Sequence, residues 1–405
     1  MDSRRNFLGK VATGLAGTLA AGPVRALGAS DRVRVGIIGA GDRGVELLNQ
    51  LRVCANTEVV AFADVYNRRL EKAAHFAPSA KQYADYRTLL EDASIDAVVI
   101  ATPPHVHAEQ FCAALEAGKH VYQEKTLATT LDQAKRMRAA YAKDRGKHTV
   151  QIGHQACSYG QQGDVAQFMT PPEKIGQVSA LAMRNYRNTP RHKPQWARPA
   201  LLTADVNPRN VNWDAFLGET PAYEFDPERF IHWRYFWDYG GGNVSESMSQ
   251  QLAFWYRALD LQIPRSATMG GGVYLWNDGR ETPDTMDVSL DQPEQMLVSW
   301  SSGFGNNQLG VTEELLGSHG TIARGNHVRY IPQKVNRPDD VERMGRASQT
   351  PHAHMENFLD SIRGGREPNC PFETGYRVTV ACLMAVEAYR TGRTVRWNAQ
   401  TEEMS

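Results

Sequence analysis

A glycine-rich turn at residues 39–44 is the part of this sequence whose residue types and spacing most clearly suggest chemistry. It follows the apolar run Val33–Ile38, opens a helical pattern, and consists of Gly39, Gly41 and Gly44 with Asp42 and Arg43 between them. The first glycine permits a tight turn, the second lets the backbone approach a pyrophosphate, and the third lets the helix pack on the strand. The order of strand, turn and helix favours a dinucleotide site over a merely structural turn.

An acidic residue follows at the position where such a site binds the adenosine ribose. Asp64 lies twenty residues beyond Gly44, directly after the apolar run Glu58–Ala63. A carboxylate there accepts hydrogen bonds from the ribose diol and repels a 2′-phosphate, so NAD is favoured over NADP. Arg68 and Arg69 stand nearby and moderate this preference.

Further polar residues come at the ends of later apolar runs. In an open parallel sheet, ligands bind beyond the carboxyl ends of the strands, which predicts that Thr102 and Lys125 face the nicotinamide end of a cleft. His154, at the crossing between two domains, is a candidate for the same cleft. The candidates for cofactor binding in these loops are Thr102, Pro103, His107, Glu124 and Lys125.

The elements that must position these residues form two domains of an α/β protein. From residue 32 to 153, short apolar runs alternate with helical patterns, which is typical of βαβ units and a doubly wound parallel Rossmann sheet. From residue 154 to 405, strand-like runs follow one another, and several alternate in period two. They predict an α+β domain with a large, mainly antiparallel open sheet. Its expected helices are 243–259, 354–363 and 375–391.

The first 29 residues differ from the rest. Arg4 and Arg5 precede a mildly apolar run from Val11 to Ala21 and small residues around Ala26. This segment resembles a twin-arginine export signal, and its apolar run is too short and too weak to span a bilayer stably. We therefore expect a periplasmic or otherwise exported protein with no stable membrane insertion after the signal is cleaved.

The composition excludes several other classes of protein. The 405 residues are 41% hydrophobic, which excludes disorder, and 45 basic residues balance 45 acidic ones, so nothing draws the chain to nucleic acid. No metal site is expected, because the pair His352 and His354 lacks acids at ligand spacing and His107 belongs to a proline-rich turn. The expected partner is a small molecule.

Five stretches of the sequence together resemble the Gfo/Idh/MocA family, which includes glucose-fructose oxidoreductase and inositol dehydrogenases. They are GAGDRG from residue 39, TPPHVHAE from 102, EAGKHVYQEK from 116, NFLDSIRGG from 357 and TGRTVRW from 391. The resemblance extends from about residue 32 to 397. It implies a nicotinamide-dependent enzyme that acts on carbohydrate and forms a homo-oligomer through its open sheet.

The resemblance assigns a role to Lys125. In the family, the lysine of a Glu-Lys-Pro triplet contacts the nicotinamide ribose and the substrate, and Lys125 is the matching position. The proline is replaced here by Thr126. Family members commonly hold the lysine-proline bond cis, but a cis bond before threonine would cost about 3–4 kcal/mol, so we predict a trans bond between Lys125 and Thr126.

A second family signature is a glycine-rich turn followed by an acid and, four residues later, a histidine. Here Gly240–Gly242 precede Glu246 and Gln250, which would share one helix face. The acid is retained, but the histidine is replaced by an amide, which orients a hydroxyl and cannot act as a general base. Proton transfer would then fall to another group: Lys125, Glu246, or a neighbour such as His232 or Tyr186.

The resemblance also places substrate contacts on the first strand of the second domain, where Arg184 and Tyr186 lie. Aromatic residues are dense from residue 196 to 237, and their faces suit the apolar faces of sugar rings. Trp237 is a candidate for such stacking, although these side chains belong more often to a core or an interface.

Together these features predict an exported, carbohydrate-directed oxidoreductase with tightly bound NAD. An exported enzyme has no free nicotinamide pool, so its cofactor must be regenerated in place. The cycle closes when one sugar is oxidised and a second substrate is reduced. It also closes in an NAD-dependent glycoside hydrolase, where transient oxidation permits elimination before re-reduction. A third alternative is a nucleotide-bearing sugar-binding protein that has lost catalysis.

Overall fold

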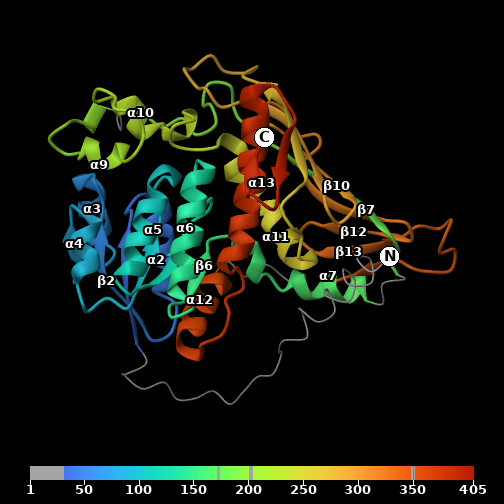
Figure 1. Ribbon diagram of the computed structural model, residues 1–405, viewed down its shortest axis with the longest axis horizontal. Coiled ribbons are helices and arrows are strands. Elements are labelled where there is room, and N and C mark those ends of the chain that lie inside the picture. The colour runs from blue at the N-terminus through green and yellow to red at the C-terminus, as the bar shows by residue number, and fades with distance from the viewer. Residues whose placement is uncertain (1–31, 171–173, 200–203, 348–349, 351) are drawn as a thin grey trace.

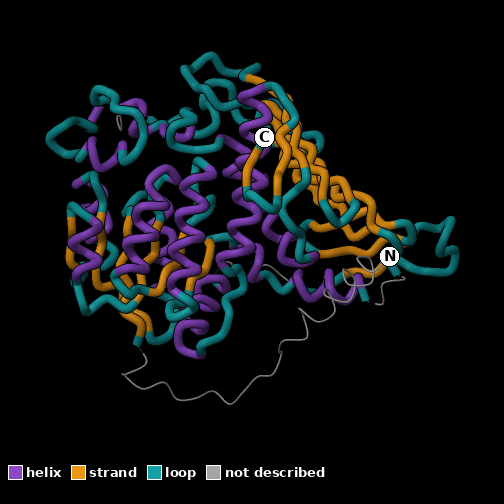
Figure 2. The backbone as a smooth tube through the Cα atoms, viewed as in Figure 1, coloured by secondary structure: helices purple, strands orange, loops and turns teal. Residues whose placement is uncertain are grey.

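The computed structural model describes residues 32–170, 174–199, 204–347, 350 and 352–405. The export signal expected at residues 1–29 lies outside these ranges. Within them the chain builds two β-sheets, with helices α11 (Ser249–Leu259) and α13 (Phe372–Thr391) between the sheets (Figures 1 and 2). No helix in the described ranges combines the length and the apolar character that a membrane crossing requires.

The first sheet has six parallel strands in the order β3-β2-β1-β4-β5-β6, so the predicted Rossmann sheet is confirmed. Its order reverses between β1 and β4, and ligands of such sheets bind at this reversal. The three-residue strand β3 was not predicted, because two of its side chains are exposed and it carries no apolar run. The strands are β1 (Val33–Ile38), β2 (Thr57–Ala63), β3 (Lys81–Tyr83), β4 (Ala97–Ile100), β5 (His120–Gln123) and β6 (Val150–Ile152).

Five helices accompany this sheet. Both faces of β4 are buried, which explains why its sequence is uniformly apolar instead of alternating. The N-terminal end of each of these helices lies near the carboxyl end of the strand before it, where the loops carry the polar residues. The helices are α2 (Asp42–Leu51), α3 (Asn67–Ala74), α4 (Tyr86–Glu91), α5 (His107–Glu116) and α6 (Leu131–Asp144).

The second sheet has ten strands in the order β14-β13-β12-β11-β7-β10-β9-β8-β15-β16. The pair β7 and β10 is parallel and the other pairs are antiparallel, as the period-two patterns predicted. The strands are β7 (Val178–Tyr186), β8 (Ser266–Gly272), β9 (Thr285–Gln292), β10 (Met296–Gly303), β11 (Val311–Gly317), β12 (Gly320–Arg324), β13 (Val328–Pro332), β14 (Arg343–Met344), β15 (Val395–Asn398) and β16 (Glu403–Met404).

The helices of the second domain join the two sheets. Helix α12 (Ala353–Gly364) and helix α13 confirm two of the predicted helices, and the third begins differently, because a π-helical turn at Val244–Met248 precedes α11. The close packing of α13 on the Rossmann sheet requires a glycine, Gly375. A Cβ on Gly375 would lie 2.6 Å from Ile152, so this glycine lets α13 pack closely on β6. Helix α7 (Gln161–Met169) follows the crossing between the domains.

Residues 204–239, which we call the cap segment, return from the second domain to the Rossmann sheet. They contain α9 (Trp213–Leu217), α10 (Pro227–Ile231) and a 3-10 turn (Trp233–Tyr235), and they lie above the α3 and α4 end of the sheet (Figure 1). The Asn212 N–H donates to the Val65 carbonyl over 2.8 Å, beside a β-bridge between residues 66 and 211. A buried cluster completes the junction: Tyr66, Val206, Val211, Phe216, Leu217, Phe230 and Tyr239.

Gly44→Ala tests the packing of the glycine turn. A Cβ at this position would lie 1.9 Å from the Gly39 carbonyl oxygen, so α2 would have to move away from β1. We expect the free energy of unfolding, measured by urea denaturation, to fall by about 2 kcal/mol or more. Gly163→Ala in α7 is the matched control. A Cβ there meets nothing within 4 Å, so this variant should be neutral or gain up to about 1 kcal/mol. An equal loss of unfolding free energy in both variants would contradict a steric clash specific to residue 44.

Candidate functional site

A cavity of about 840 Å³ lies at the carboxyl ends of the Rossmann strands, with the cap segment on its other side. It receives side chains from the strand loops, from the cap segment and from the helix that follows the second glycine turn. Most of the predicted cofactor residues line it, and Gly44 and His107 lie behind the lining. The predicted residues in the wall are Gly39, Gly41, Asp42, Arg43, Asp64, Thr102, Pro103, Glu124, Lys125, Glu246 and Gln250.

The first glycine turn forms the floor of one end of this cavity. Gly39 has a φ of +96°, and a Cβ there would lie 2.7 Å from the Ala101 carbonyl oxygen, so glycine is required at this position. Gly41 is the N-cap of α2 and supplies no side-chain cap, which leaves the first N–H groups of the helix for a ligand. Such a helix end favours an anion. The turn therefore fits a dinucleotide pyrophosphate.

Asp64 lies at the end of β2, beside this turn. Its Oδ2 accepts a hydrogen bond from the Ala40 N–H at 2.8 Å, and its Oδ1 accepts one from the Tyr66 N–H at 2.9 Å. Burial raises the pKa of this carboxyl group, while Arg69 and the backbone N–H groups oppose the rise. The backbone fixes the carboxylate at the cavity wall, where it fits the ribose-binding acid of a dinucleotide site.

Arg43 and Glu124 bind each other across the cavity floor. The Arg43 guanidinium lies 2.7 to 2.8 Å from Glu124 Oε1, and the second carboxylate oxygen of Glu124 accepts the Lys125 N–H at 3.1 Å. Charge-assisted hydrogen bonds of this kind are the strong ones in proteins. They join the glycine turn to the loop after β5. These two parts of the predicted cofactor site are therefore held in a fixed relative position.

His107 connects the loops after β4 and β5 from behind the cavity. It is fully buried, with Nδ1 2.8 Å from the Thr126 carbonyl oxygen and Nε2 2.8 Å from the Thr102 carbonyl oxygen. Burial lowers the pKa of this imidazole, and the two backbone carbonyl groups oppose that shift. In the structure His107 therefore positions two loops that line the cavity.

The predicted trans bond between Lys125 and Thr126 is wrong, because this peptide bond is cis. The prediction used only the local preference of a peptide bond before threonine. Buried partners fix the chain just after the bond. The Thr126 carbonyl oxygen faces His107, and the Leu127 N–H donates to Thr379 Oγ1 on α13 over 3.2 Å.

Lys125, Glu246 and Arg234 meet at the other end of the cavity. Lys125 Nζ lies 3.1 Å from Glu246 Oε2, and Arg234 Nε lies 3.2 Å from Glu246 Oε1. Burial alone would raise the pKa of Glu246, but the Arg234 and Lys125 charges outweigh it and lower the pKa to about 2. Glu246 is therefore ionised at neutral pH and acts there as a hydrogen-bond acceptor.

The π-helical turn sets the geometry of the second family signature. Glu246 stands within this turn and Gln250 in the first turn of α11, and both line the cavity. Single π-helical turns inside helices occur frequently at functional sites. Sequence reasoning found both residues but missed Arg234. The one signal for Arg234 is its place as a lone cation among aromatic residues just before the glycine turn.

Five predicted substrate residues do not line the cavity. Arg184 and Tyr186 lie on β7, and the Tyr186 ring faces Gly303 of the neighbouring strand. The Trp237 ring centroid lies 5.9 Å from that of Tyr389 on α13. The remaining two predicted residues are His154 and His232.

His154 and His232 have different surroundings. His154 is fully buried, neither ring nitrogen has a hydrogen-bond partner, and burial together with the charge of Lys125 lowers its pKa to about 3. His232 accepts the Arg198 N–H at Nε2, and its Nδ1 lies 2.7 Å from Glu228. Within the described ranges, no three His, Cys, Asp or Glu side chains are grouped in a way that would hold a metal ion.

Comparison with known proteins places this site in a family. Residues 33–154 match the Gfo/Idh/MocA oxidoreductase family, which has an NAD-binding Rossmann fold. An inositol 2-dehydrogenase/D-chiro-inositol 3-dehydrogenase of Lacticaseibacillus casei is 37% identical over 385 residues, which cover 90% of this chain and 95% of that relative. The chain belongs to the Gfo/Idh/MocA family. An inositol 2-dehydrogenase of Salmonella typhimurium is also 37% identical, over 123 residues that span 36% of its length.

Solved structures of dehydrogenases share the fold over almost the whole chain. The WlbA dehydrogenase of Bordetella pertussis, solved with NADH and UDP-GlcNAcA, has a TM-score of 0.69 and 17% identity and covers 91% of this chain and 99% of its own. A levoglucosan dehydrogenase, solved with NADH and levoglucosan, has a TM-score of 0.67 and 18% identity and covers 90% and 99%. These likenesses confirm the fold class, a parallel Rossmann sheet with a large, mainly antiparallel second sheet.

Glu246→Gln tests the ionised carboxylate. A pKa near 2 lies below the ordinary 4.5, so ionised Glu246 stabilises the fold above about pH 4.5, and this contribution is lost as the pH falls towards 2. We expect the variant to be less stable than the wild type at pH 7 by roughly 2–3 kcal/mol, because two cations lose their partner.

The measurement is urea denaturation across this pH range. The stability gap between wild type and variant should narrow between about pH 4.5 and pH 2. Glu58→Gln removes a surface partner of Arg32 and is the control, with an expected gap of about 0.5 kcal/mol or less. A Glu246→Gln gap that stays constant down to about pH 2 would contradict the lowered pKa.

Proposed function

We propose that this chain is an exported, carbohydrate-directed oxidoreductase that keeps NAD bound and regenerates it in place. The observation that carries the proposal is the meeting of Lys125, Arg234 and Glu246 at one end of the dinucleotide cavity. Two cationic donors around one ionised acceptor suit neighbouring hydroxyl groups, each of which both donates and accepts a hydrogen bond.

Each residue of this group has a proposed role toward a sugar. NAD, when bound, supplies a hydride acceptor that becomes a donor after reduction. Lys125 lines the cavity beside Glu246, and we assign to it the contact with the reacting hydroxyl and the transfer of its proton. In the structure its Nζ donates to Glu246 and to the backbone carbonyls of residues 245 and 246, and a substrate hydroxyl would replace one of these partners. Glu246 accepts from a neighbouring hydroxyl. The Gln250 amide, which both donates and accepts, orients the ring.

The substrate class rests on relatives and on this donor set. The similar proteins include inositol dehydrogenases, a levoglucosan dehydrogenase and a dehydrogenase solved with UDP-GlcNAcA. Their names support a cyclic polyol or sugar for this chain. Trp233 also lines the cavity, under the Arg234 guanidinium, and offers an aromatic face near the same end.

NAD is the proposed cofactor in preference to NADP. Asp64 stands where the adenosine ribose would bind, and its charge would repel a 2′-phosphate. The neighbouring cations are engaged by acids: Arg68 lies 3.3 Å from Asp205, and Arg69 lies 3.8 Å from Asp64. Both arginines line the cavity, so they can still serve the phosphates of a dinucleotide.

Export and self-association complete the proposal. The twin-arginine pattern at residues 1–29 supports a periplasmic location, and that location requires an internally recycled cofactor. The exposed apolar side chains of Leu297 on β10 and Val311 on β11 support a homo-oligomer formed through the second sheet, because a second copy would remove them from water.

Lys125→Ala tests the catalytic assignment. Loss of the proton-handling group should lower kcat at least about 100-fold, while the nucleotide stays bound. Turnover is followed with a sugar substrate, and bound nucleotide is quantified after denaturation. Lys81→Ala, which removes a surface lysine paired with Asp92, is the control and should keep its turnover. Turnover of Lys125→Ala at the wild-type rate would remove the proposed mechanism.

The nucleotide itself is the second test. Mature protein purified without added cofactor should release about one NAD or NADH per chain on denaturation, identified by mass spectrometry. Sugars should then change the nicotinamide absorbance of the intact protein. Release of an aglycone from a glycoside with no net change in absorbance would favour the glycoside hydrolase, and binding without any redox change would favour a non-catalytic protein. A chain that lacks nucleotide and does not bind added NAD would overturn the proposal.

A further inference from the structure

Arg198 reaches the dinucleotide end of the cavity from the second domain. It lines the cavity, and its NH2 lies 3.0 Å from Oδ2 of Asp42, the first residue of α2. The Arg198 side chain is 41% exposed and that of Asp42 is 66% exposed, so the pair stands in water at the mouth of the cavity. No motif in the sequence identified Arg198, and it lies outside the family match at residues 33–154.

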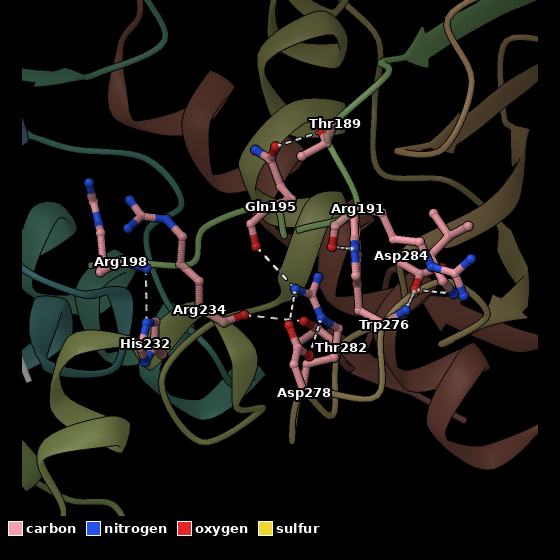
Figure 3. Close-up of polar contacts among 12 residues, drawn as sticks. Thr189, Arg191, Gln195, Arg198, His232, Arg234, Trp276, Asp278, Thr282 and Asp284 are labelled. Carbon is pink, nitrogen blue, oxygen red and sulfur yellow. Dashed lines mark hydrogen bonds and ion pairs between the residues drawn. The ribbon is translucent and has the colours of Figure 1, made fainter. Parts of the chain in front are cut away.

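The loop that carries Arg198 is anchored along its length (Figure 3). The Thr189 N–H donates to the Phe304 carbonyl over 2.8 Å, which fixes the start of the loop. Trp276 Nε1 donates to the Arg191 carbonyl over 3.2 Å, and this bond fixes its middle. A loop held in this way delivers Arg198 to a defined place, as a functional loop on a rigid scaffold does.

The strongest anchor is Arg280. Its side chain has no exposed surface, it binds Asp278 through two hydrogen bonds of 2.7 and 2.8 Å, and it donates to the Gln195 carbonyl over 3.2 Å. The guanidinium carbon lies 4.4 Å from the Tyr235 ring centroid and 4.7 Å from that of Trp276. Arg280 therefore joins the loop to the cap segment and to the second domain, away from the cavity.

His232 fixes the backbone of Arg198 itself. Its Nε2 accepts the Arg198 N–H at 3.0 Å, so the ring proton must sit on Nδ1, which donates to Glu228 over 2.7 Å. The ring also stacks on Tyr235, with 5.2 Å between centroids. The backbone of Arg198 is therefore held in place. Its guanidinium is paired with the exposed carboxylate of Asp42 and can exchange this partner for another anion. Arg198 and Arg234 extend toward the same side of this scaffold (Figure 3).

We propose that Arg198 binds the diphosphate of the dinucleotide, an inference that rests on the proposed function. The uncapped N-terminus of α2 supplies backbone N–H groups for that anion, and a planar guanidinium matches phosphate oxygens with two parallel hydrogen bonds. Arg198 leaves Asp42 when the dinucleotide enters. Asp42 keeps a cation, because Lys72 Nζ lies 3.7 Å from its other oxygen.

The test compares ligands with and without the diphosphate. Arg198→Ala in the full chain, stripped of nucleotide, should weaken NAD and ADP-ribose binding at least about tenfold and speed NAD dissociation, while adenosine binds as in the wild type. Arg198→Lys should recover part of the loss. Arg265→Ala, which removes an exposed arginine paired with Asp291 on the second sheet, is the control and should bind NAD as the wild type does.

A second variant separates ligand binding from a structural latch. Asp42→Asn frees Arg198 and removes a negative charge beside the diphosphate, so it should bind NAD as tightly as the wild type or more tightly. If Asp42→Asn binds NAD as weakly as Arg198→Ala does, the ion pair between Arg198 and Asp42 merely holds the loop, and the inference is overturned. Equal losses for adenosine and NAD in Arg198→Ala, or no loss at all, would also overturn it. A wild type that binds no NAD would refute the proposed function itself.

Discussion

A carboxylate that is partly removed from water needs cations or hydrogen-bond donors to stay ionised, and Glu246 is paired with two cations that come from different parts of the chain. Lys125 lies in the loop after β5, Arg234 belongs to the cap segment, and Glu246 stands in the turn before α11. All three are partly buried and line the cavity. Their pairing therefore sets the relation between the two domains and the cap segment, and with it the shape of the cavity end where a substrate would lie.

The pairing of Glu246 with two cations also bears on the replacement of the family histidine by Gln250. The low pKa of Glu246 makes it a weak proton acceptor, and an amide does not titrate, so neither residue substitutes for a histidine as a general base. Both serve to hold hydroxyl groups. The buried His154 does not take this role either, because burial and the charge of Lys125 lower its pKa to about 3 and it does not line the cavity.

Much of the site was predictable because it follows regular elements. The apolar runs located five of the six Rossmann strands, and the loops after them gave Asp64, Glu124 and Lys125 directly. Arg198 and Arg234 were missed because they lie in the long irregular stretch between β7 and α11, whose path is set by tertiary contacts such as those of Arg280. His232 was predicted as a substrate contact from its chemistry, whereas its geometry makes it a support for a neighbouring backbone.

Backbone hydrogen bonds and a buried aromatic cluster join the cap segment to the Rossmann domain. The cap segment is therefore a fixed wall of the cavity. Because the wall is fixed, the order in which the parts of the chain fold determines when the cavity is complete. Residues 32–153 leave the ribosome before residues 204–239, and domains generally fold as units from the N-terminus during synthesis. The groove therefore exists before its wall. The cavity is completed only when the aromatic cluster packs, so its final shape depends on both parts of the chain having folded.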